Sequence, residues 1–305
     1  MRRYFVACAL ALVGLAFLPA LLWAAPVVRS GVTTLGALDP TFTALLNDFR
    51  SDLGGILNPP GPCSPPCTSG RREINWDAVP DTLSSPNAFP GDFFNGTTGV
   101  QPNGRIRGAL FTTPGTGFQV SADTTPDPAG TAPEFGNLQG FAPGEFDAFS
   151  LQRLFTSLGS HFTDVTFAVP GTPGTLASTH GFGVVFADVD FDGSASLEFF
   201  KRNGASLGLF DVPGVFPTPD PNSNSQGSFS FLGVSFTMGE QVTRVRIRSG
   251  SHALDQPFSG VEDAVVMDDF LYGEPQALAA VPEPGTLLLL ASGLAGLVAW
   301  RRRAA

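Results

Sequence analysis

Short runs in which apolar and polar residues alternate fill most of the chain beyond residue 100, and turns rich in glycine, proline and asparagine separate them. A period of two is typical of strands with one buried face, and many short strands between such turns are typical of β-sandwiches and barrels. The turn Asn203-Gly204 predicts a hairpin, because both residues tolerate the positive φ angles that a tight turn needs. The predicted strands cover residues 106–112, 117–122, 163–169, 181–190, 195–201, 205–212, 228–236, 241–248 and 263–272.

Helical periodicity is clear in one earlier segment, where apolar residues recur every three or four positions. Asp39 suits the N-cap, Pro40 suits the first turn, and a Gly-Gly pair ends the segment. The apolar positions are Phe42, Leu45, Leu46, Phe49 and Leu53. We therefore expect one amphipathic helix and a proline-rich loop in residues 25–70. A mainly β, jelly-roll-like β-sandwich should follow over residues 71–275.

The first 24 residues have the three parts of a secretory signal peptide. Basic Arg2 and Arg3 precede an apolar run from Phe5 to Trp23, and small residues follow it. We expect signal peptidase to remove residues 1–24. An uncleaved membrane anchor is the alternative that the sequence leaves open.

A second apolar segment lies at the C-terminal end, from Gly285 to Trp300, and three arginines follow it. At about 1.5 Å per residue its 16 residues reach about 24 Å, which is short for a bilayer but spans a thin one together with its flanks. Arginines that stay cytoplasmic would leave the body of the protein outside. We expect a transmembrane helix here, after a linker at residues 276–281.

Pro-Glu-Pro, an apolar helix and an arginine cluster, in this order at the end of an exported chain, resemble the PEP-CTERM sorting signal of Gram-negative bacteria. The resemblance covers residues 282–303, and the residues that carry it are Pro282, Glu283, Pro284, Arg301, Arg302 and Arg303. It implies recognition by an exosortase-type membrane protease and cleavage near Pro-Glu-Pro. It also implies a membrane-anchored precursor that is passed to the cell surface or the extracellular matrix. Three stretches of the body also resemble PEP-CTERM proteins without assigned activity, namely residues 70–77, 113–118 and 265–270.

The composition limits the partners of the body. Charged residues make up only 14% of the chain, and its 28 phenylalanines are too many for a disordered protein. Without the two terminal segments, 12 basic and 26 acidic side chains give a net charge of −14. A nucleic-acid-binding protein needs basic surface to neutralise phosphates, so nucleic acid is not an expected partner.

Cys63 and Cys67 are the two cysteines of the body, and they lie in a proline-rich loop. The exported compartment is oxidising, so we expect a short local disulfide. A metal site would need further cysteines or histidines nearby, and the sequence has none there. Such a small ring should stiffen its own loop rather than hold the fold together.

Three aspartates at alternate positions resemble the first half of an EF-hand calcium loop. An EF-hand loop requires a glutamate at its twelfth position, but Phe199 stands there. The segment is also predicted as strand, so an EF-hand is excluded. Three carboxylates on one strand face would still repel one another, and a looser Ca²⁺ site would relieve the repulsion. The favoured alternative is a facing row of arginines. The aspartates are Asp188, Asp190 and Asp192, and the arginines are Arg244, Arg246 and Arg248.

Asp268 and Asp269 lie in the middle of the last predicted strand. Because neighbouring side chains point to opposite faces of a strand, one of the two carboxylates should join an apolar row. A buried carboxylate needs a partner, and backbone N–H groups, an arginine or Ca²⁺ would each serve. We expect a structural role for both residues.

The expected function is that of a non-enzymatic, acidic protein of the cell surface or extracellular matrix. An extracellular polysaccharide-binding module, with or without Ca²⁺, is the alternative. A secreted hydrolase comes third, because a glycosidase needs two carboxylates at a set separation and the sequence cannot select a pair among 26 acids. No catalytic residue and no cofactor other than a structural Ca²⁺ is expected.

Overall fold

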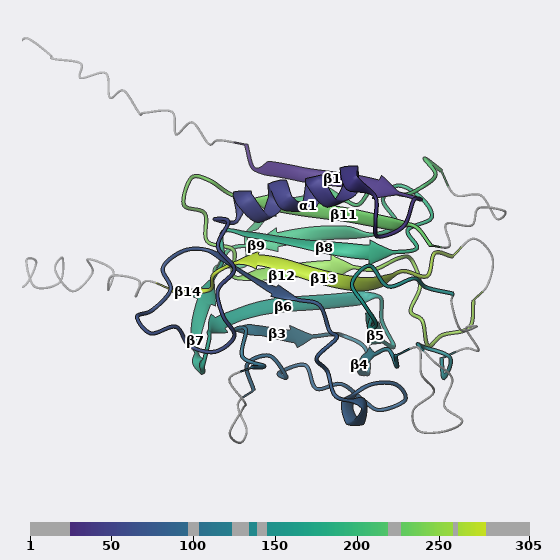
Figure 1. Cartoon of the computed structure of the whole chain (residues 1–305), viewed down its shortest axis with the longest axis horizontal. Coiled ribbons are helices and arrows are strands. Elements are labelled where there is room, and N and C mark those ends of the chain that lie inside the picture. The colour runs from purple at the N-terminus through teal and green to yellow at the C-terminus, as the bar shows by residue number, and fades with distance from the viewer. Residues whose placement is uncertain are drawn as a thin grey trace, which may run out of the picture.

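Two antiparallel β-sheets pack face to face and form a mainly β, sandwich-like body (Figure 1). The computed structural model describes residues 25–96, 104–123, 134–138, 145–218, 227–258 and 262–278. Sheet A has the order β1 (Val27–Thr33), β11 (Phe229–Ser235), β8 (Gly181–Ala187), β13 (Val266–Gly273), β5 (Phe155–Leu158) and β4 (Gly117–Val120), and β2 (Arg71–Ile74) also pairs with β13. Sheet B has the order β10 (Ser206–Asp211), β9 (Ser196–Phe200), β12 (Arg244–Arg248), β6 (Phe162–Val169), β7 (Thr172–Ser178) and β14 (Gln276–Ala277), and β3 (Ala109–Thr112) also pairs with β6.

All nine predicted strands are confirmed, because an observed strand overlaps each predicted range. The predicted hairpin between β9 and β10 is also present, with Gly204 at a φ of 80° and its N–H donating to the Lys201 carbonyl oxygen. The sequence did not predict β1, β2, β5, β7 and β14. Three of these have four residues or fewer, and β7 contains Pro173 and Gly174, which are rare in strands.

An aromatic cluster fills the space between the two sheets. At its centre the indole ring of Trp76 stacks on Phe155, with 4.1 Å between ring centroids and 2° between their planes. Trp76 is 1% exposed, and its Nε1–H donates to the Asp268 carbonyl oxygen at 2.7 Å. Because a buried indole N–H without a partner would be costly, this bond fixes the ring against β13.

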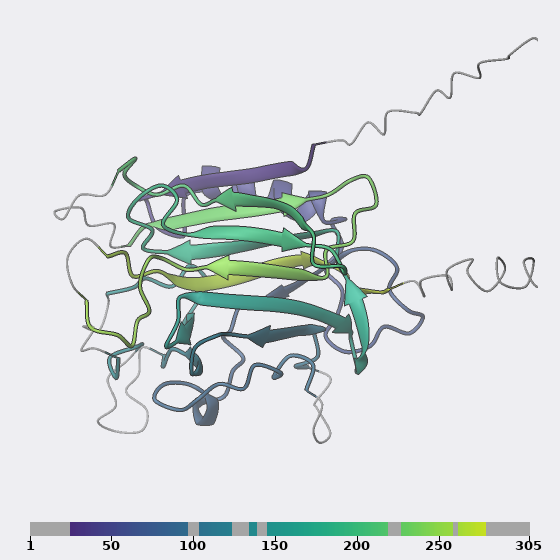
Figure 2. The same cartoon turned by 180° about the vertical axis from the view of Figure 1, so that it is seen from behind.

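The predicted helix is confirmed as α1 (Pro40–Asp52), with Asp39 as its N-cap. The helix lies on the outer face of sheet A, in front of β1 and β11 in Figure 1 and behind them in Figure 2. Its close approach depends on Gly183 in β8 and Gly233 in β11, which face each other across the strand pair. A Cβ atom on either glycine would come within 2.7 Å of the Phe49 ring. The segment before residue 71 is thus part of the sandwich, since β1 pairs with β11 and α1 covers them.

Within the described residues, no helix is long and apolar enough to cross a membrane. The predicted signal peptide at residues 1–24 and the predicted transmembrane helix at residues 285–300 both lie outside those residues. The body ends close to the predicted sorting signal. β14 occupies the first two residues of the stretch predicted as a linker, and the Leu278 N–H still donates to the Leu176 carbonyl oxygen.

Candidate functional site

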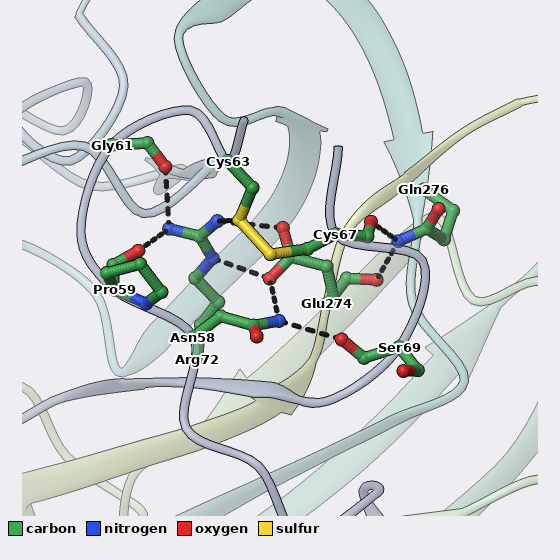
Figure 3. Close-up of a disulfide and its surroundings, with 9 residues drawn as sticks. All are labelled: Asn58, Pro59, Gly61, Cys63, Cys67, Ser69, Arg72, Glu274 and Gln276. Atoms are coloured by element: carbon green, nitrogen blue, oxygen red, sulfur yellow. Dashed lines mark hydrogen bonds and ion pairs between the residues drawn. A yellow bond between two sulfur atoms is a disulfide. The ribbon is translucent and has the colours of Figure 1, made fainter. Parts of the chain in front are cut away.

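The predicted disulfide between Cys63 and Cys67 is confirmed, and a buried ion pair lies beside it (Figure 3). Arg72 from β2 is 0% exposed and holds Glu274, which follows β13, through two bonds. Nε lies 2.7 Å from Oε2 and Nη2 lies 2.8 Å from Oε1. The remaining Arg72 donors reach the Pro59 and Gly61 carbonyl oxygens. All charges in this cluster are therefore neutralised or hydrogen-bonded.

This cluster joins the disulfide loop to the last strands of the body. The Asn58 side chain donates to Glu274 at 2.8 Å, and the Gln276 amide donates to the Cys67 carbonyl oxygen at 2.9 Å. A surface hollow of about 310 Å³ lies between the loop and the end of β13. Among the described residues, the cluster of possible metal-ligand atoms within 4.8 Å of one another is Cys63, Cys67 and Glu274. Its two sulfurs are bonded to each other, so they are not free thiolate ligands, and we assign the cluster a structural role.

The prediction that Asp188, Asp190 and Asp192 lie on one strand face is wrong. Strand β8 ends at Ala187, and Asp188 has a φ of 68°, which turns the chain out of the sheet. Asp192 is exposed, and its carboxylate accepts the Gly214 N–H at 2.8 Å. The regular spacing in the sequence therefore does not correspond to one shared face.

The arginine row on β12 is present but faces a different carboxylate from the predicted ones. Arg244 Nη1 lies 2.8 Å from one Asp164 oxygen, and Arg246 Nη2 lies 2.7 Å from the other. Arg248 donates to the Gly193 carbonyl oxygen and lies 4.0 Å from Asp211. Burial alone would raise the pKa of Asp164, but the two guanidinium groups hold it below its ordinary value. The predicted charge pairing thus exists with Asp164 on β6, where β6 and β12 are direct neighbours.

Asp263 is the acidic residue that the sequence analysis missed. It precedes β13 and is 1% exposed, and its Oδ2 accepts the Asp190 N–H at 3.2 Å. Its Oδ1 has no hydrogen-bond partner among the described residues. The signal in the sequence was weak, because Asp263 lies 73 residues away from Asp190 in the chain.

The sequence predicted that Asp268 and Asp269 point to opposite faces of the last strand. In the structure they point to the same side of β13. The pairing of β13 with β8 shifts register between Met267 and Phe270, which marks a β-bulge. Met267 and Phe270 point into the core between the sheets, whereas Val266 and Leu271 point to the side covered by α1. The bulge places both aspartates on that second side, where each interacts with Ser150.

The two carboxyl groups of this pair are satisfied to different degrees. Asp268 accepts three hydrogen bonds, from the Phe149 N–H at 2.7 Å, the Ser150 N–H at 3.1 Å and the Ser150 hydroxyl at 2.8 Å. One Asp269 oxygen has no hydrogen-bond partner within the described ranges. Burial raises the pKa of Asp268 well above its ordinary value, and the neighbouring Asp269 charge adds to this. Burial also raises the pKa of Asp269, to about 6. The contacts support the structural role expected for Asp268.

A second hollow, of about 200 Å³, is lined by the carboxyl-bearing residues Glu134 and Asp147. Hydrolysis of a glycoside needs two carboxylates on either side of a bound sugar. The rest of the lining is mostly apolar and includes Phe146, Leu151 and Phe229. The hollow is small for such a substrate, since pockets for small molecules usually measure about 300–1,000 Å³.

The six predicted sorting residues lie outside the described part of the chain, but a comparison of sequences tests them. The PEP-CTERM protein-sorting motif matches residues 280–303, which include all six. The chain therefore carries a PEP-CTERM sorting motif, as predicted. The motif marks an exported protein that is processed by an exosortase-type system.

The other comparisons give no information on the activity of the body. No curated protein sequence matches the chain. One solved structure, the enzymatically active domain of tailspike protein 4 from bacteriophage CBA120, matches with 12% identity and a TM-score of 0.20. The match covers 55% of this chain but only 19% of the tailspike chain. At this TM-score the similarity supports no conclusion about fold or function.

Proposed function

We propose that this protein is an acidic, non-enzymatic component of the cell surface or extracellular matrix, delivered by an exosortase-type route. The observation that carries the proposal is the sorting motif, placed directly after the folded body. The last described backbone hydrogen bond is made by Leu278, and Pro282 follows four residues later. Cleavage near Pro-Glu-Pro would therefore release the whole sandwich without removing one of its described strands.

The N-terminal boundary fits the same route. β1 begins at Val27, so removal of residues 1–24 by signal peptidase would leave it intact. The precursor would then be held by residues 285–300 as a transmembrane helix, with its arginines in the cytoplasm. Both proposed cuts fall outside the paired strands, which is what a folded cargo needs if it is trimmed after folding.

The surface chemistry favours this proposal over a polysaccharide-binding module. Sugar-binding proteins often stack sugar rings on exposed tryptophan and tyrosine side chains. Between the two terminal segments the sequence contains one residue of each type, Trp76 and Tyr272, and both are buried in the core. A glycan array would detect selective binding, which we do not expect.

Replacement of Pro282, Glu283 and Pro284 by alanine tests the sorting route. We expect export to continue and the full-length protein to accumulate in the membrane, because the processing enzyme would no longer recognise it. Immunoblotting of membrane and surface fractions measures both outcomes. A variant with alanine at Pro65 and Pro66, two exposed positions of the disulfide loop, should be sorted normally. Release of the sorting variant to the surface at the mature mass would contradict the proposal.

A further inference from the structure

The loop that follows β8 is held against two other parts of the chain. Its backbone runs beside residues 213–216, with the Val215 N–H donating to the Val189 carbonyl oxygen and the Phe216 N–H to the Asp190 carbonyl oxygen. The Asp190 N–H donates in turn to Asp263, as described above. These bonds use the backbone of the loop and place Asp190 next to Asp263, and the charge of Asp188 also acts on the Asp263 carboxyl group.

The Asp263 carboxyl group lacks the partners that a buried anion requires. It is 1% exposed, and its Oδ1 accepts no hydrogen bond from the part of the chain that the structure describes. The Ser194 hydroxyl is buried beside it and acts on its pKa, but does not reach hydrogen-bond geometry with any atom of the described residues. A buried carboxylate without compensation is strongly destabilising, so charge of the opposite sign would be favourable here.

The charges around Asp263 increase this imbalance. Burial, together with the negative charges of Asp190 and Asp188, raises the pKa of the Asp263 carboxyl group to about 7. The arginines of β12 do not relieve it, because two of them are held by Asp164 and the third lies against Gly193 and Asp211. An external cation would meet three acidic side chains and one hydroxyl.

We propose that Asp188, Asp190 and Asp263 form a Ca²⁺ site, with the Ser194 hydroxyl as an additional oxygen. Carboxylate, hydroxyl and water oxygens are the ligands that Ca²⁺ takes, and its flexible geometry suits ligands from separate loops. The three aspartates do not bring their oxygens within 4.8 Å of one another, so the ion would draw them together. Asp192, which the sequence suggested as a ligand, is occupied at the exposed side of the loop.

This proposal is independent of the sorting route, so either one can fail alone. The ion binds only the folded state, and a ligand of this kind stabilises the protein by RT ln(1 + c/Kd), where c is the Ca²⁺ concentration, so the effect begins near the Kd and then grows with the logarithm of the concentration. Extracellular calcium modules bind with a Kd of about 10⁻⁴–10⁻³ M, so the effect should appear at millimolar Ca²⁺. Mg²⁺ should act less, because it requires a tighter octahedron and loses its water reluctantly.

The test uses the full chain, treated with EDTA, dialysed, and melted with increasing CaCl₂ or MgCl₂. We expect CaCl₂ to raise the Tm by about 2–4 °C when binding contributes a tenfold shift in the folding equilibrium. MgCl₂ should give less than half of this shift. Calorimetric titration with CaCl₂ should give a stoichiometry of one.

Three variants identify the ligands. Asp263→Asn and Asp190→Asn should each abolish the Ca²⁺ shift, and Asp192→Asn, the matched control from the same loop, should retain it. Because Asp190 is only half-buried, its variant decides the outcome if Asp263→Asn fails to fold. A Tm that does not change between EDTA and millimolar Ca²⁺ would overturn the proposal. Loss of the shift in Asp192→Asn would overturn the ligand assignment.

Discussion

Asp263 and Asp268 lie five residues apart on the same stretch of chain, and both are almost fully buried. Their surroundings differ in the number of donors. Among the described residues, Asp268 accepts three hydrogen bonds from Phe149 and Ser150, whereas Asp263 accepts one and its second oxygen has no partner. The fold thus contains one carboxylate enclosed by protein donors and one that faces other acids.

The comparison shows that burial alone does not separate a structural acid from a binding residue. A buried acid that the chain itself satisfies gains nothing from an added ion. A buried acid with an unpartnered oxygen beside further carboxylates is stabilised by a cation. The three predictions below concern the satisfied Asp268, its less satisfied neighbour Asp269 and the arginine row of β12, from the largest expected effect to the smallest.

Asp268→Ala should cause the largest loss of stability. The substitution leaves two backbone N–H groups and the Ser150 hydroxyl without their acceptor in a buried site. We expect the free energy of unfolding to fall by about 3 kcal/mol, measured by urea denaturation.

The control is Asp268→Asn. Its amide oxygen can still accept both backbone N–H groups, and its amide nitrogen can donate to the Ser150 oxygen. It should cost only about 1 kcal/mol. Equal losses in the two variants would show that the hydrogen bonds do not hold this carboxyl group in place.

Asp269→Asn should change how stability depends on pH. The pKa of Asp269 is about 6 in the folded state, raised by burial above the unfolded value of about 3.9. Between these two values the unfolded state releases its proton and the folded state keeps it, so the stability of the native protein falls as pH rises. Above the folded pKa the whole cost is present, on the order of 3 kcal/mol.

Melting curves from pH 4.5 to 7.5 measure this effect as the difference between the native protein and Asp269→Asn. The variant cannot ionise, so its stability relative to the native protein should improve toward pH 7.5. Parallel pH profiles of the two proteins would show that Asp269 does not titrate in this range.

Arg246→Ala should have the smallest effect. Asp164 would keep Arg244 at 2.8 Å, and the Arg246 side chain is 42% exposed, so solvent screens the lost interaction. We expect a loss of about 0.5 kcal/mol, which should shrink further in 1 M NaCl. Thermal melts at low and high salt measure it, and a loss as large as that of Asp268→Ala would contradict this view of β12.

The sequence predicted the parts of the fold that depend on local pattern. The helix after Asp39, the strand alternation and the Asn-Gly turn each result from interactions between residues close in the chain, and so does the disulfide ring. Strand β7 was not predicted because a proline and a glycine lower the local preference of this segment for strand structure. Its pairing with β6 overrides that preference.

The sequence could not predict the arrangement of the acids, for two physical reasons. The bulge in β13 reverses the alternation after Met267, and no local residue preference marks that position. The contact between Asp190 and Asp263 depends on how strands far apart in the chain come together. Spacing along one segment therefore suggested Asp192, whereas the packing of the sandwich brings in Asp263.

The short pairing of β14 with β7 determines which part of the body would detach first if a mechanical force acted on the C-terminal segment. A load applied beyond Leu278 would reach β14 first, and β14 is paired with β7 through only two residues at the border of sheet B. This strand would peel away one pair at a time. The load would then meet Glu274, which is clamped by Arg72, and β13, which is paired on both sides inside sheet A. β14 would thus detach before the loops of the proposed Ca²⁺ site and the aromatic core are disturbed.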